Sequence, residues 1–280
     1  MRSDVPGRPH GREPFEPEDR LRVSQALATV ARGLAPDRIP AALCRACVAL
    51  LPVTGASVSI SGGATVRATW CASDTTAARL AEAQYTLGDG PCHSAIQQAT
   101  AMLAADLTTA PDSGRWPVFA HEAVALGVRA VFSLPLGAEG AAIGTLDLYR
   151  RSPGELSERE LRIASWTRDA VTFALTNLHA CARAAGQAAA EEERASWLEA
   201  SEADHGEVYQ AVGMVMVQLN LAPEEALDRL RARAFTQGRT VTEVARDVIA
   251  RKLRFASEPD TGLEDAAHRD ACDDGREDDR

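Results

Sequence analysis

The stretch from Glu207 to Phe255 constrains the fold of this chain more than any other, because the limits of three helices can be read from it. Pro223 opens the second helix, where a proline costs no hydrogen bond, and Gly238 is placed to end it. Thr240 and Glu243 have the spacing of a capping box at the start of the third helix. The first helix has an apolar stripe at helical spacing, formed by Val208, Ala211, Val212, Val215 and Leu219. The stretch therefore predicts a small three-helix bundle.

The surface of this predicted bundle is rich in arginine. It has eight cations and six carboxylates, a difference of +2, in a chain of net charge −10. The cations are Arg229, Arg231, Arg233, Arg239, Arg246, Arg251, Lys252 and Arg254. Guanidinium groups bind phosphate through paired hydrogen bonds, so nucleic acid is one partner for such a surface. A merely solvated surface is the alternative, and charge alone favours it, because the chain has 29 arginines and one lysine.

The order and spacing of several residues in this stretch match a known module. They are Ala211, Gly213, Pro223, Glu225, Ala226, Leu230, Arg231, Ala234, Arg239, Val241, Val244, Ala245 and Val248. The stretch thereby resembles the ANTAR module, the RNA-binding output domain of bacterial transcription antitermination regulators. The resemblance implies a protein that binds paired RNA hairpins as a dimer and blocks a terminator. The RNA-binding residues that we predict from it are Ala211, Gly213, Arg231, Arg239, Thr240, Arg246, Arg251 and Lys252.

One position departs from the ANTAR pattern. Val212 stands where the family usually has a lysine, between the alanine and the glycine of the first helix. A lost cation on an RNA-binding surface would weaken phosphate contacts. The alternative hypothesis is therefore a ligand-binding or protein-interaction regulator with a degenerate ANTAR module that does not bind RNA.

The residues before the bundle alternate between helical and strand patterns. Helices are expected at 21–34, 39–52 and 116–126, and strands at 56–62, 64–73, 101–107, 128–136 and 141–151. A last helix is expected to begin at Ser157, where Ser157 and Glu160 have capping-box spacing. This order predicts an α+β fold, an antiparallel sheet flanked by helices, followed by a long helix and the three-helix bundle.

This order of elements resembles a GAF domain, a relative of the PAS sensor fold. The residues that carry the resemblance are Leu87, Gly88, Gly90, Pro91, Cys92, Trp116, Gly127, Val128, Leu134, Pro135, Gly144, Leu146 and Leu148. It implies a sensor with a pocket for a small-molecule ligand, which we expect to be lined by Cys92, His93, Trp116, Phe119 and Phe132. GAF domains take cyclic nucleotides, haem, tetrapyrroles, small metabolites or nothing, and no pattern here selects one. We therefore assign no cofactor.

The cysteines invite sharper interpretations that the sequence does not favour. Cys44 and Cys47 form a C-x-x-C in an apolar helix without a second pair to complete a metal site, so a buried structural role is expected. Cys92 follows Pro91 at a helix start, where the dipole favours thiolate, but Asp89 opposes this. A packed or pocket-lining thiol is the favoured interpretation. The six scattered cysteines predict reduced thiols rather than a disulfide framework.

An enzyme is the third hypothesis, because some GAF proteins reduce free methionine sulfoxide with cysteines clustered around one pocket. Only Cys92 is suitably placed for such a cluster, so we predict that this chain is not an enzyme.

The domain limits follow from composition. We expect a disordered tail at 1–18, the GAF domain at 19–182, a helical linker at 183–204, the ANTAR domain at 205–256 and a disordered acidic tail at 257–280. The acidic tail has three cations and ten carboxylates, a difference of −7, and either competes with RNA for the basic surface or serves solubility. The linker either pairs with its mate in a homodimer or is a plain spacer. No signal peptide or membrane span is apparent, so a cytoplasmic location is expected.

Overall fold

The computed structural model describes residues 17–31, 38–61, 67–138, 140–184 and 206–256. Most of the predicted N-terminal tail and of the predicted linker, and the acidic C-terminal tail, lie outside these residues, whereas Pro17 and Glu18 of the predicted tail begin a helix. The described residues from 17 to 184 form the sheet domain, and those from 206 to 256 form the C-terminal bundle.

The sheet domain is built on five antiparallel strands, which confirms the predicted fold class. The order across the sheet is β2-β1-β5-β4-β3. The strands are β1 (Gly55–Ser61), β2 (Arg67–Ala72), β3 (Met102–Ala104), β4 (Ala130–Ala138) and β5 (Ala141–Arg150). Gly144 lies in β5 where the carbonyl oxygen of Ser59 would collide with a side chain. Glycine at this position lets the two central strands approach.

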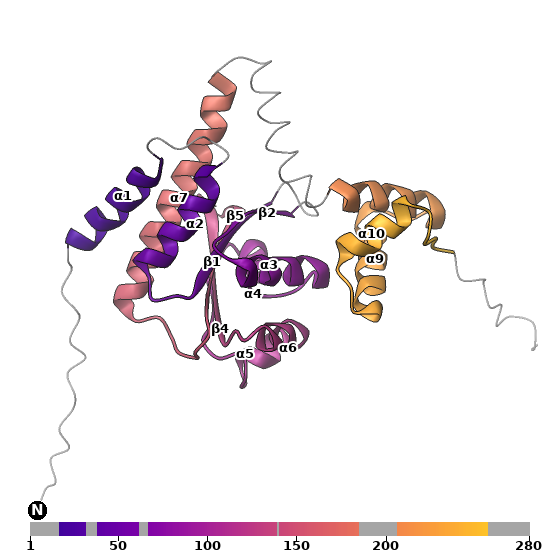
Figure 1. Ribbon diagram of the computed structural model, residues 1–280, viewed down its shortest axis with the longest axis horizontal. Coiled ribbons are helices and arrows are strands. Elements are labelled where there is room, and N and C mark those ends of the chain that lie inside the picture. The colour runs from indigo at the N-terminus through magenta and orange to yellow at the C-terminus, as the bar shows by residue number, and fades with distance from the viewer. Residues whose placement is uncertain (1–16, 32–37, 62–66, 139, 185–205, 257–280) are drawn as a thin grey trace, which may run out of the picture.

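Helices cover both faces of the sheet (Figure 1). One face packs against α2 (Ile39–Leu50) and α7 (Glu158–Ala184), and α1 (Pro17–Ala31) packs on these two helices. The other face is covered by α3 (Thr75–Leu87), α4 (Pro91–Gln98) and α6 (Pro117–Ala125), with the short α5 (Asp112–Arg115) beside α6. Each layer has its own apolar cluster, so the sheet separates two cores. At the start of α7 the predicted capping pair is confirmed, because the Ser157 amide donates to Glu160 and the Glu160 amide to Ser157.

The two faces of the sheet differ in chemistry. Toward α2 and α7 the strands present apolar side chains such as Val58, Leu146 and Leu148. Because strand residues alternate between faces, the intervening positions point toward α3 and α4. Several of these are polar and yet buried: Ser57, Ser59, Ser133, Thr145 and Asp147. Five buried polar side chains on one sheet face are unusual for a plain core, so this face is a candidate site.

The C-terminal bundle has the three predicted helices, at 206–219, α9 (Pro223–Gln237) and α10 (Val241–Ile249). Gly238 ends α9 with a φ of 60°, which favours glycine. The Glu243 amide donates to Thr240 Oγ1 at 3.2 Å, and the Thr240 amide donates to Glu243 Oε2 at 2.9 Å. These contacts confirm the predicted limits. The residues predicted to be buried form one cluster with Leu227 and Leu230.

The cysteines depart from the expectation of reduced thiols. The structure joins Cys44 of α2 to Cys71 of β2 in a disulfide, because α2 packs across β1 and β2 and brings the two side chains together. Cys47 is a free thiol and fully buried, and burial raises its pKa to about 12. The expected burial of the C-x-x-C pair is therefore confirmed, whereas the expected absence of a disulfide is wrong.

No helix in the described part of the chain is both long and apolar enough to cross a membrane.

Candidate functional site

Two of the predicted RNA-binding arginines hold the C-terminal bundle together. Arg239 donates from Nη1 to Asp247 Oδ2 at 2.8 Å and from Nη2 to the carbonyl oxygen of Glu243 at 2.9 Å, which fastens the turn between α9 and α10. Arg246 donates from Nε to Glu207 Oε2 at 2.6 Å and ties α10 to the first helix. Arg246 is more than half exposed, so its pair with Glu207 is weakened by solvent.

Arg231 of α9 reaches out of the bundle to the sheet domain. Its Nε donates to the carbonyl oxygen of Tyr85 at 3.1 Å, and its guanidinium carbon lies 5.7 Å from the centre of the Tyr85 ring. Its Nη1 is 3.3 Å from Asp228 Oδ1. The side chain is 17% exposed. Nε of this arginine is therefore held by the last turn of α3, and Nη1 by Asp228 of its own helix.

The start of α10 is also covered by α3. The Val241 amide donates to Thr86 Oγ1 at 3.2 Å, and Thr242 Oγ1 donates to Glu82 Oε1 at 3.3 Å. Val241 is the first residue of α10, so its amide has no acceptor within the helix. Thr86 therefore supplies the missing acceptor from the other domain. The predicted RNA-binding residue Thr240 lies beside this contact, as the cap of α10.

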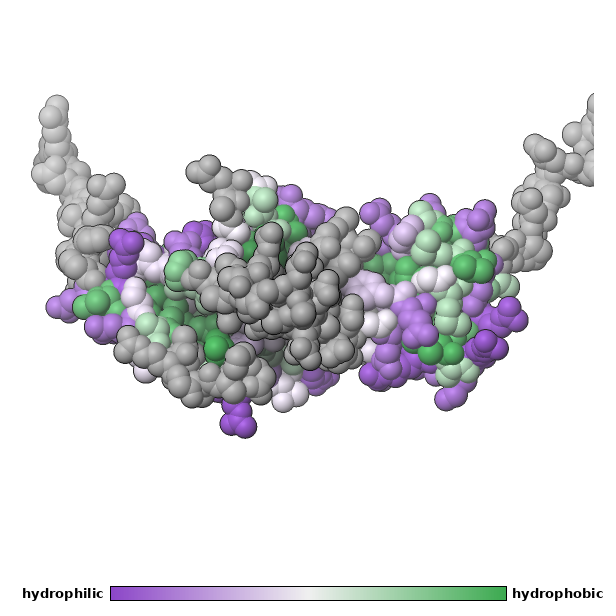
Figure 2. Space-filling view, turned by 90° about the horizontal axis from the view of Figure 1, so that it is seen from above, coloured by the Kyte–Doolittle hydropathy of each residue, from purple (hydrophilic) through white to green (hydrophobic). Residues whose placement is uncertain are grey.

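The remaining cations of the bundle are exposed and have no ion pair recorded with another described residue. They are Arg229, Arg233, Arg251, Lys252 and Arg254. Arg251 and Lys252 are among the predicted site residues, whereas Arg229, Arg233 and Arg254 are not. Arg229 and Arg233 are four residues apart on α9, a spacing that places them on one helix face and could have identified them from sequence. Figure 2 shows hydrophilic and apolar surface side by side on the bundle.

The first helix of the bundle corrects one predicted residue. Ala211 is fully buried in the bundle core, so its side chain packs there and is closed to RNA. Gly213 is exposed, and nothing lies within 4 Å of the place where a side chain would begin. Val212 is 8% exposed and belongs to the same core. In this fold the position of the family's lysine is a packing position.

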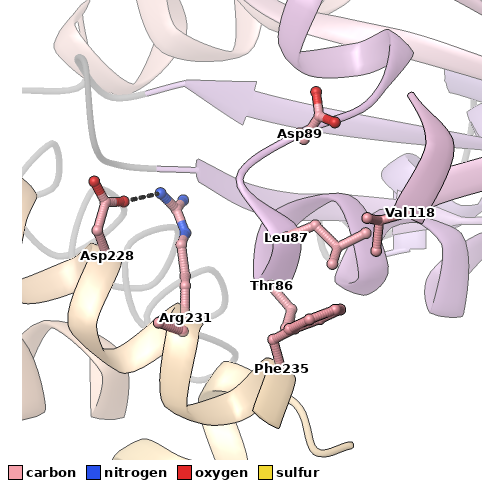
Figure 3. Close-up of a pocket in the computed structure, with 8 residues that line it drawn as sticks. Thr86, Leu87, Asp89, Val118, Asp228, Arg231 and Phe235 are labelled. Carbon is pink, nitrogen blue, oxygen red and sulfur yellow. Dashed lines mark hydrogen bonds and ion pairs between the residues drawn. The ribbon is translucent and has the colours of Figure 1, made fainter. Parts of the chain in front are cut away.

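A hollow of about 340 Å³ opens between the two domains beside Arg231 (Figure 3). Its walls combine apolar and charged side chains from both domains. The sheet domain contributes Thr86, Leu87, Asp89 and Val118, and the bundle contributes Asp228, Arg231, Ala232 and Phe235. Phe235 remains 58% exposed and Val118 38% exposed. The domains are therefore incompletely packed at this edge of their contact.

A second candidate site lies beneath α4 on the polar face of the sheet. Cys92 is 2% exposed, and its Sγ is 3.0 Å from Thr145 Oγ1, which in turn donates to Asp147 Oδ2 at 2.9 Å. A threonine hydroxyl has one hydrogen, and Asp147 accepts it, so the Cys92 thiol is the donor toward Thr145. Ser133 is opposite Asp147 on β4, and its buried hydroxyl has no hydrogen-bond partner among the described residues. This arrangement ties Cys92 of α4 to the polar face of the sheet.

The predicted pocket residues are only partly brought together. Trp116 and Phe119 are buried with α3, α4 and α6, and Trp116 Nε1 donates to Ser94 Oγ at 3.0 Å. His93 follows Cys92 and is half-buried. Phe132 is wrongly assigned, because it packs on the opposite face of the sheet with α2 and α7. Its neighbour Ser133 occupies the face where Cys92 lies.

Comparison with known families identifies both domains. A GAF domain model matches residues 33–176, and an ANTAR domain model matches residues 198–249. The chain belongs to the GAF family and carries an ANTAR domain after the GAF domain. Both resemblances seen in the sequence are thereby confirmed. The sheet domain is the GAF domain, and the C-terminal bundle is the described part of the ANTAR domain.

Solved structures resemble the chain at low identity. The GAF domain of the Acinetobacter phosphoenolpyruvate-protein phosphotransferase is 8% identical, with a TM-score of 0.46 over 60% of this chain and 99% of that one. Its counterpart from Coxiella burnetii is 14% identical, with a TM-score of 0.44 over 60% and 99%. The type II free methionine-R-sulfoxide reductase of Thermoplasma acidophilum is 14% identical, with a TM-score of 0.35 over 54% and 89%. No curated protein matches the chain.

The polar residues that distinguish the GAF sheet are not recognisable as a site from the sequence alone. In β5, Thr145 and Asp147 alternate with leucines, and in β1, Ser57 and Ser59 alternate with Ala56 and Val58. Such alternation usually marks a face in contact with water. Here α3 and α4 cover that face, so the residues are buried instead. These residues form a candidate site because α3 and α4 cover them, which the strand sequences alone do not show.

Proposed function

We propose that this protein is a cytoplasmic, signal-responsive regulator that binds hairpin RNA through its ANTAR domain and prevents transcription termination. The GAF domain is the sensor. The observation that carries the proposal is the set of five exposed cations on α9 and after α10, which form no recorded ion pair within the described residues of an acidic chain. Cations held by carboxylates on their own surface have little to gain from RNA, whereas these five can bind phosphates without first breaking such a pair.

The place of Val212 in the core weakens the argument for a degenerate ANTAR module that does not bind RNA. Because Val212 packs in the core, it removes one cation without exposing an apolar group to the RNA. The exposed cations lie on other elements, Arg229 and Arg233 on α9 and Arg251 and Lys252 just beyond α10. The alternative, a ligand-binding or protein-interaction regulator with a degenerate ANTAR module, requires that these cations make no RNA contact.

A homodimer is part of the proposal. The long helix α7 extends beyond the sheet (Figure 1), and Phe173 on it is 67% exposed. A large exposed aromatic side chain on a long helix supports pairing with a second copy, and two-fold dimers are the commonest oligomers. Two ANTAR domains in one dimer could then hold the two hairpins that the family's mechanism needs.

The GAF domain is proposed to take a small-molecule ligand at the polar face beneath α4. Asp147 and Thr145 bring a carboxylate and a hydroxyl there, bonded to each other, and the Ser133 hydroxyl has no hydrogen-bond partner among the described residues. Such side chains suit a small polar molecule with hydrogen-bond donors. A ligand that binds the folded domain would raise its melting temperature, by an amount that grows with the logarithm of the ligand concentration divided by its dissociation constant.

A titration with hairpin RNA tests the proposal. The variant is the double substitution Arg229→Ala and Arg233→Ala, and the probe is a synthetic RNA with two tandem hairpins. If both side chains contact phosphates, affinity falls and the slope of log K against log salt decreases by about 0.7 to 0.9 for each lost contact. The matched control is Arg20→Ala with Arg45→Ala, two exposed arginines on α1 and α2. Equal affinity and slope in both double variants would support the degenerate alternative.

A further inference from the structure

We propose that helix α3 of the GAF domain autoinhibits the ANTAR domain, by occupying through its last two turns a surface of α9 and α10 that RNA also requires. The inference rests on the proposed function, because it names how that function is regulated. It follows from four contacts that α3 makes across the domain boundary and from the way in which α3 is anchored on the sensor side.

The first contact occupies an arginine that could bind phosphate. Arg231 donates to the Tyr85 carbonyl oxygen at 3.1 Å and pairs with Asp228 at 3.3 Å, and little of it is exposed. A guanidinium binds phosphate through two parallel donors on one edge. Tyr85 takes Nε, so Arg231 can offer the edge that contains Nε to RNA only after this bond is broken. RNA binding through that edge of Arg231 and docking of α3 therefore exclude each other.

The second and third contacts occupy the N-terminus of α10. Thr86 accepts from the Val241 amide, and the Glu82 carboxylate accepts from Thr242 Oγ1. The free amides and the dipole of a helix N-terminus favour an anion. Glu82 thus places a carboxylate close to where a phosphate would be favoured. Tyr85, whose carbonyl oxygen accepts from Arg231, lies one turn further along α3. Together these groups present RNA-like acceptors to the same face of the ANTAR domain.

The fourth contact supplies the apolar part of the docking. Tyr85 is 3% exposed and packs in the same cluster as the ANTAR core, although it belongs to the GAF domain. Burial raises the pKa of its phenol, and the neighbouring Tyr209 of the ANTAR domain raises it further. A buried tyrosine contributes substantial apolar area to a contact. Docking is therefore more than a pair of surface hydrogen bonds.

The same contact is small enough to be reversible. Among the described helices, α3 makes the principal contacts with α9 and α10, and the hollow beside Arg231 leaves Phe235 largely exposed. Small, partly open contacts between domains of one chain are weak, and relative domain motion is expected. A contact of this size can be displaced by a partner with several phosphates.

The anchoring of α3 connects the docking surface to the sensor. Gln84 is buried, and its Oε1 accepts from the Cys92 amide at 2.8 Å, while Cys92 bonds to Thr145 on the polar sheet face. Gln84 precedes Tyr85 directly. A change at the polar face that shifts Cys92 would therefore move the turn of α3 that holds Arg231. This gives the GAF domain a short physical route to the ANTAR surface.

The test uses two full-length variants on the GAF side, so that no ANTAR residue is altered. Glu82→Arg reverses the charge facing α10, and Thr86→Val removes the acceptor for the Val241 amide with little change in shape or charge. The control Glu155→Arg makes the same charge change at an exposed loop of the GAF domain. Two quantities are measured: hydrogen exchange at the Val241 amide, and the dissociation constant for the synthetic RNA with two tandem hairpins.

Autoinhibition predicts that the Val241 amide exchanges faster in both variants than in the unmodified protein. The control should exchange as slowly as the unmodified protein. Autoinhibition also predicts tighter RNA binding by at least about fivefold, the lower end of typical coupling between sites. Fast exchange at Val241 in the unmodified protein would overturn the docking itself. Faster exchange in the variants without tighter RNA binding would overturn autoinhibition, although α3 would still be shown to dock on the ANTAR domain. If no form binds the RNA, the proposed function fails and the competition fails with it, whereas Val241 exchange still reports whether α3 docks.

Discussion

The carbonyl oxygen of Tyr85 in α3 accepts a hydrogen bond from Nε of Arg231 in α9, at 3.1 Å, across the boundary between the GAF and ANTAR domains. The two residues are 146 positions apart in the chain. The Arg231 side chain is thereby placed where it can bind either the GAF domain or RNA. The same arginine belongs to the ANTAR pattern, so its engagement by the sensor bears directly on regulation.

Replacing Arg231 with alanine should therefore have two opposed effects on RNA binding. It removes a cation, which weakens binding, and it removes the bond to Tyr85, which releases the ANTAR domain. We expect Arg231→Ala to cost less RNA affinity than Arg229→Ala, whose side chain makes no recorded contact with the described part of the GAF domain. The measurement is the dissociation constant of each variant at two salt concentrations. A larger loss for Arg231→Ala at both concentrations would contradict the account.

Replacing Arg239 with alanine should lower the stability of the ANTAR bundle. Arg239 bonds to Asp247 and to the Glu243 carbonyl at the corner between α9 and α10, and it is 34% exposed. Hydrogen bonds to charged groups contribute about 1.5–3 kcal/mol when well formed, and exposure reduces this to about 1 kcal/mol. Thermal unfolding followed by circular dichroism measures the loss. Arg251→Ala is the control, and an equal melting temperature for the two variants would contradict the structural role of Arg239.

Replacing Asp74 with alanine should destabilise α3 at its other end. Asp74 Oδ1 accepts from the amides of Thr76 and Ala77 and from the Tyr149 hydroxyl, which makes it the N-cap of α3. Loss of such a cap costs about 1 kcal/mol. The measurement is the free energy of unfolding by urea.

The Asp74 effect should depend on pH in a defined direction. Burial raises the pKa of Asp74, but hydrogen bonds from Ser73, Ala77, Tyr149 and Thr76 outweigh it, so the pKa in the folded protein lies below its usual value of 3.8. The stabilisation is therefore fully present above pH 3.8 and is lost as the pH falls through the lower folded-state value. We expect the gap between the unmodified protein and Asp74→Ala to be constant near neutrality and to shrink in acid. A gap that grows in acid would contradict this assignment.

Replacing Phe173 with aspartate should weaken the proposed homodimer. Phe173 is 67% exposed on α7, and a carboxylate there would be buried without a partner if α7 pairs with its mate. Sedimentation velocity at micromolar concentration measures the change. Leu21→Asp is the control, since Leu21 is a 57% exposed apolar residue on α1. A 29.8 kDa species for the unmodified protein, with and without RNA, would show that no dimer forms.

The sequence predicts features that depend on neighbours in the chain and misses those that depend on packing. Gly238 and Thr240 mark helix ends through local backbone geometry, and both limits are confirmed. The assignment of Phe132 to the ligand pocket is wrong, because Phe132 lies on the same sheet face as Leu134, opposite Cys92. The Cys44–Cys71 disulfide depends on how α2 crosses β2, which spacing does not reveal.

The contact between the GAF and ANTAR domains also depends on packing, so the sequence does not predict it. Nothing in the helical pattern of 75–87 distinguishes Glu82, Tyr85 and Thr86 from ordinary residues of a GAF helix. Their role emerges only when the ANTAR domain is placed beside α3. The family pattern makes Arg231 an RNA-binding candidate, whereas its contact with Tyr85 is visible only in the folded protein.

Crosslinking and sequencing of RNA bound to the full-length protein in its own cells tests the central claim most directly. The comparison is between the unmodified protein and the double variant Arg229→Ala with Arg233→Ala, expressed at equal levels. The account predicts that RNA leaders with tandem hairpins ahead of terminators are enriched with the unmodified protein and depleted with the variant. Identical RNA profiles for the two proteins, with no enrichment of hairpin leaders, would contradict RNA binding by the ANTAR domain.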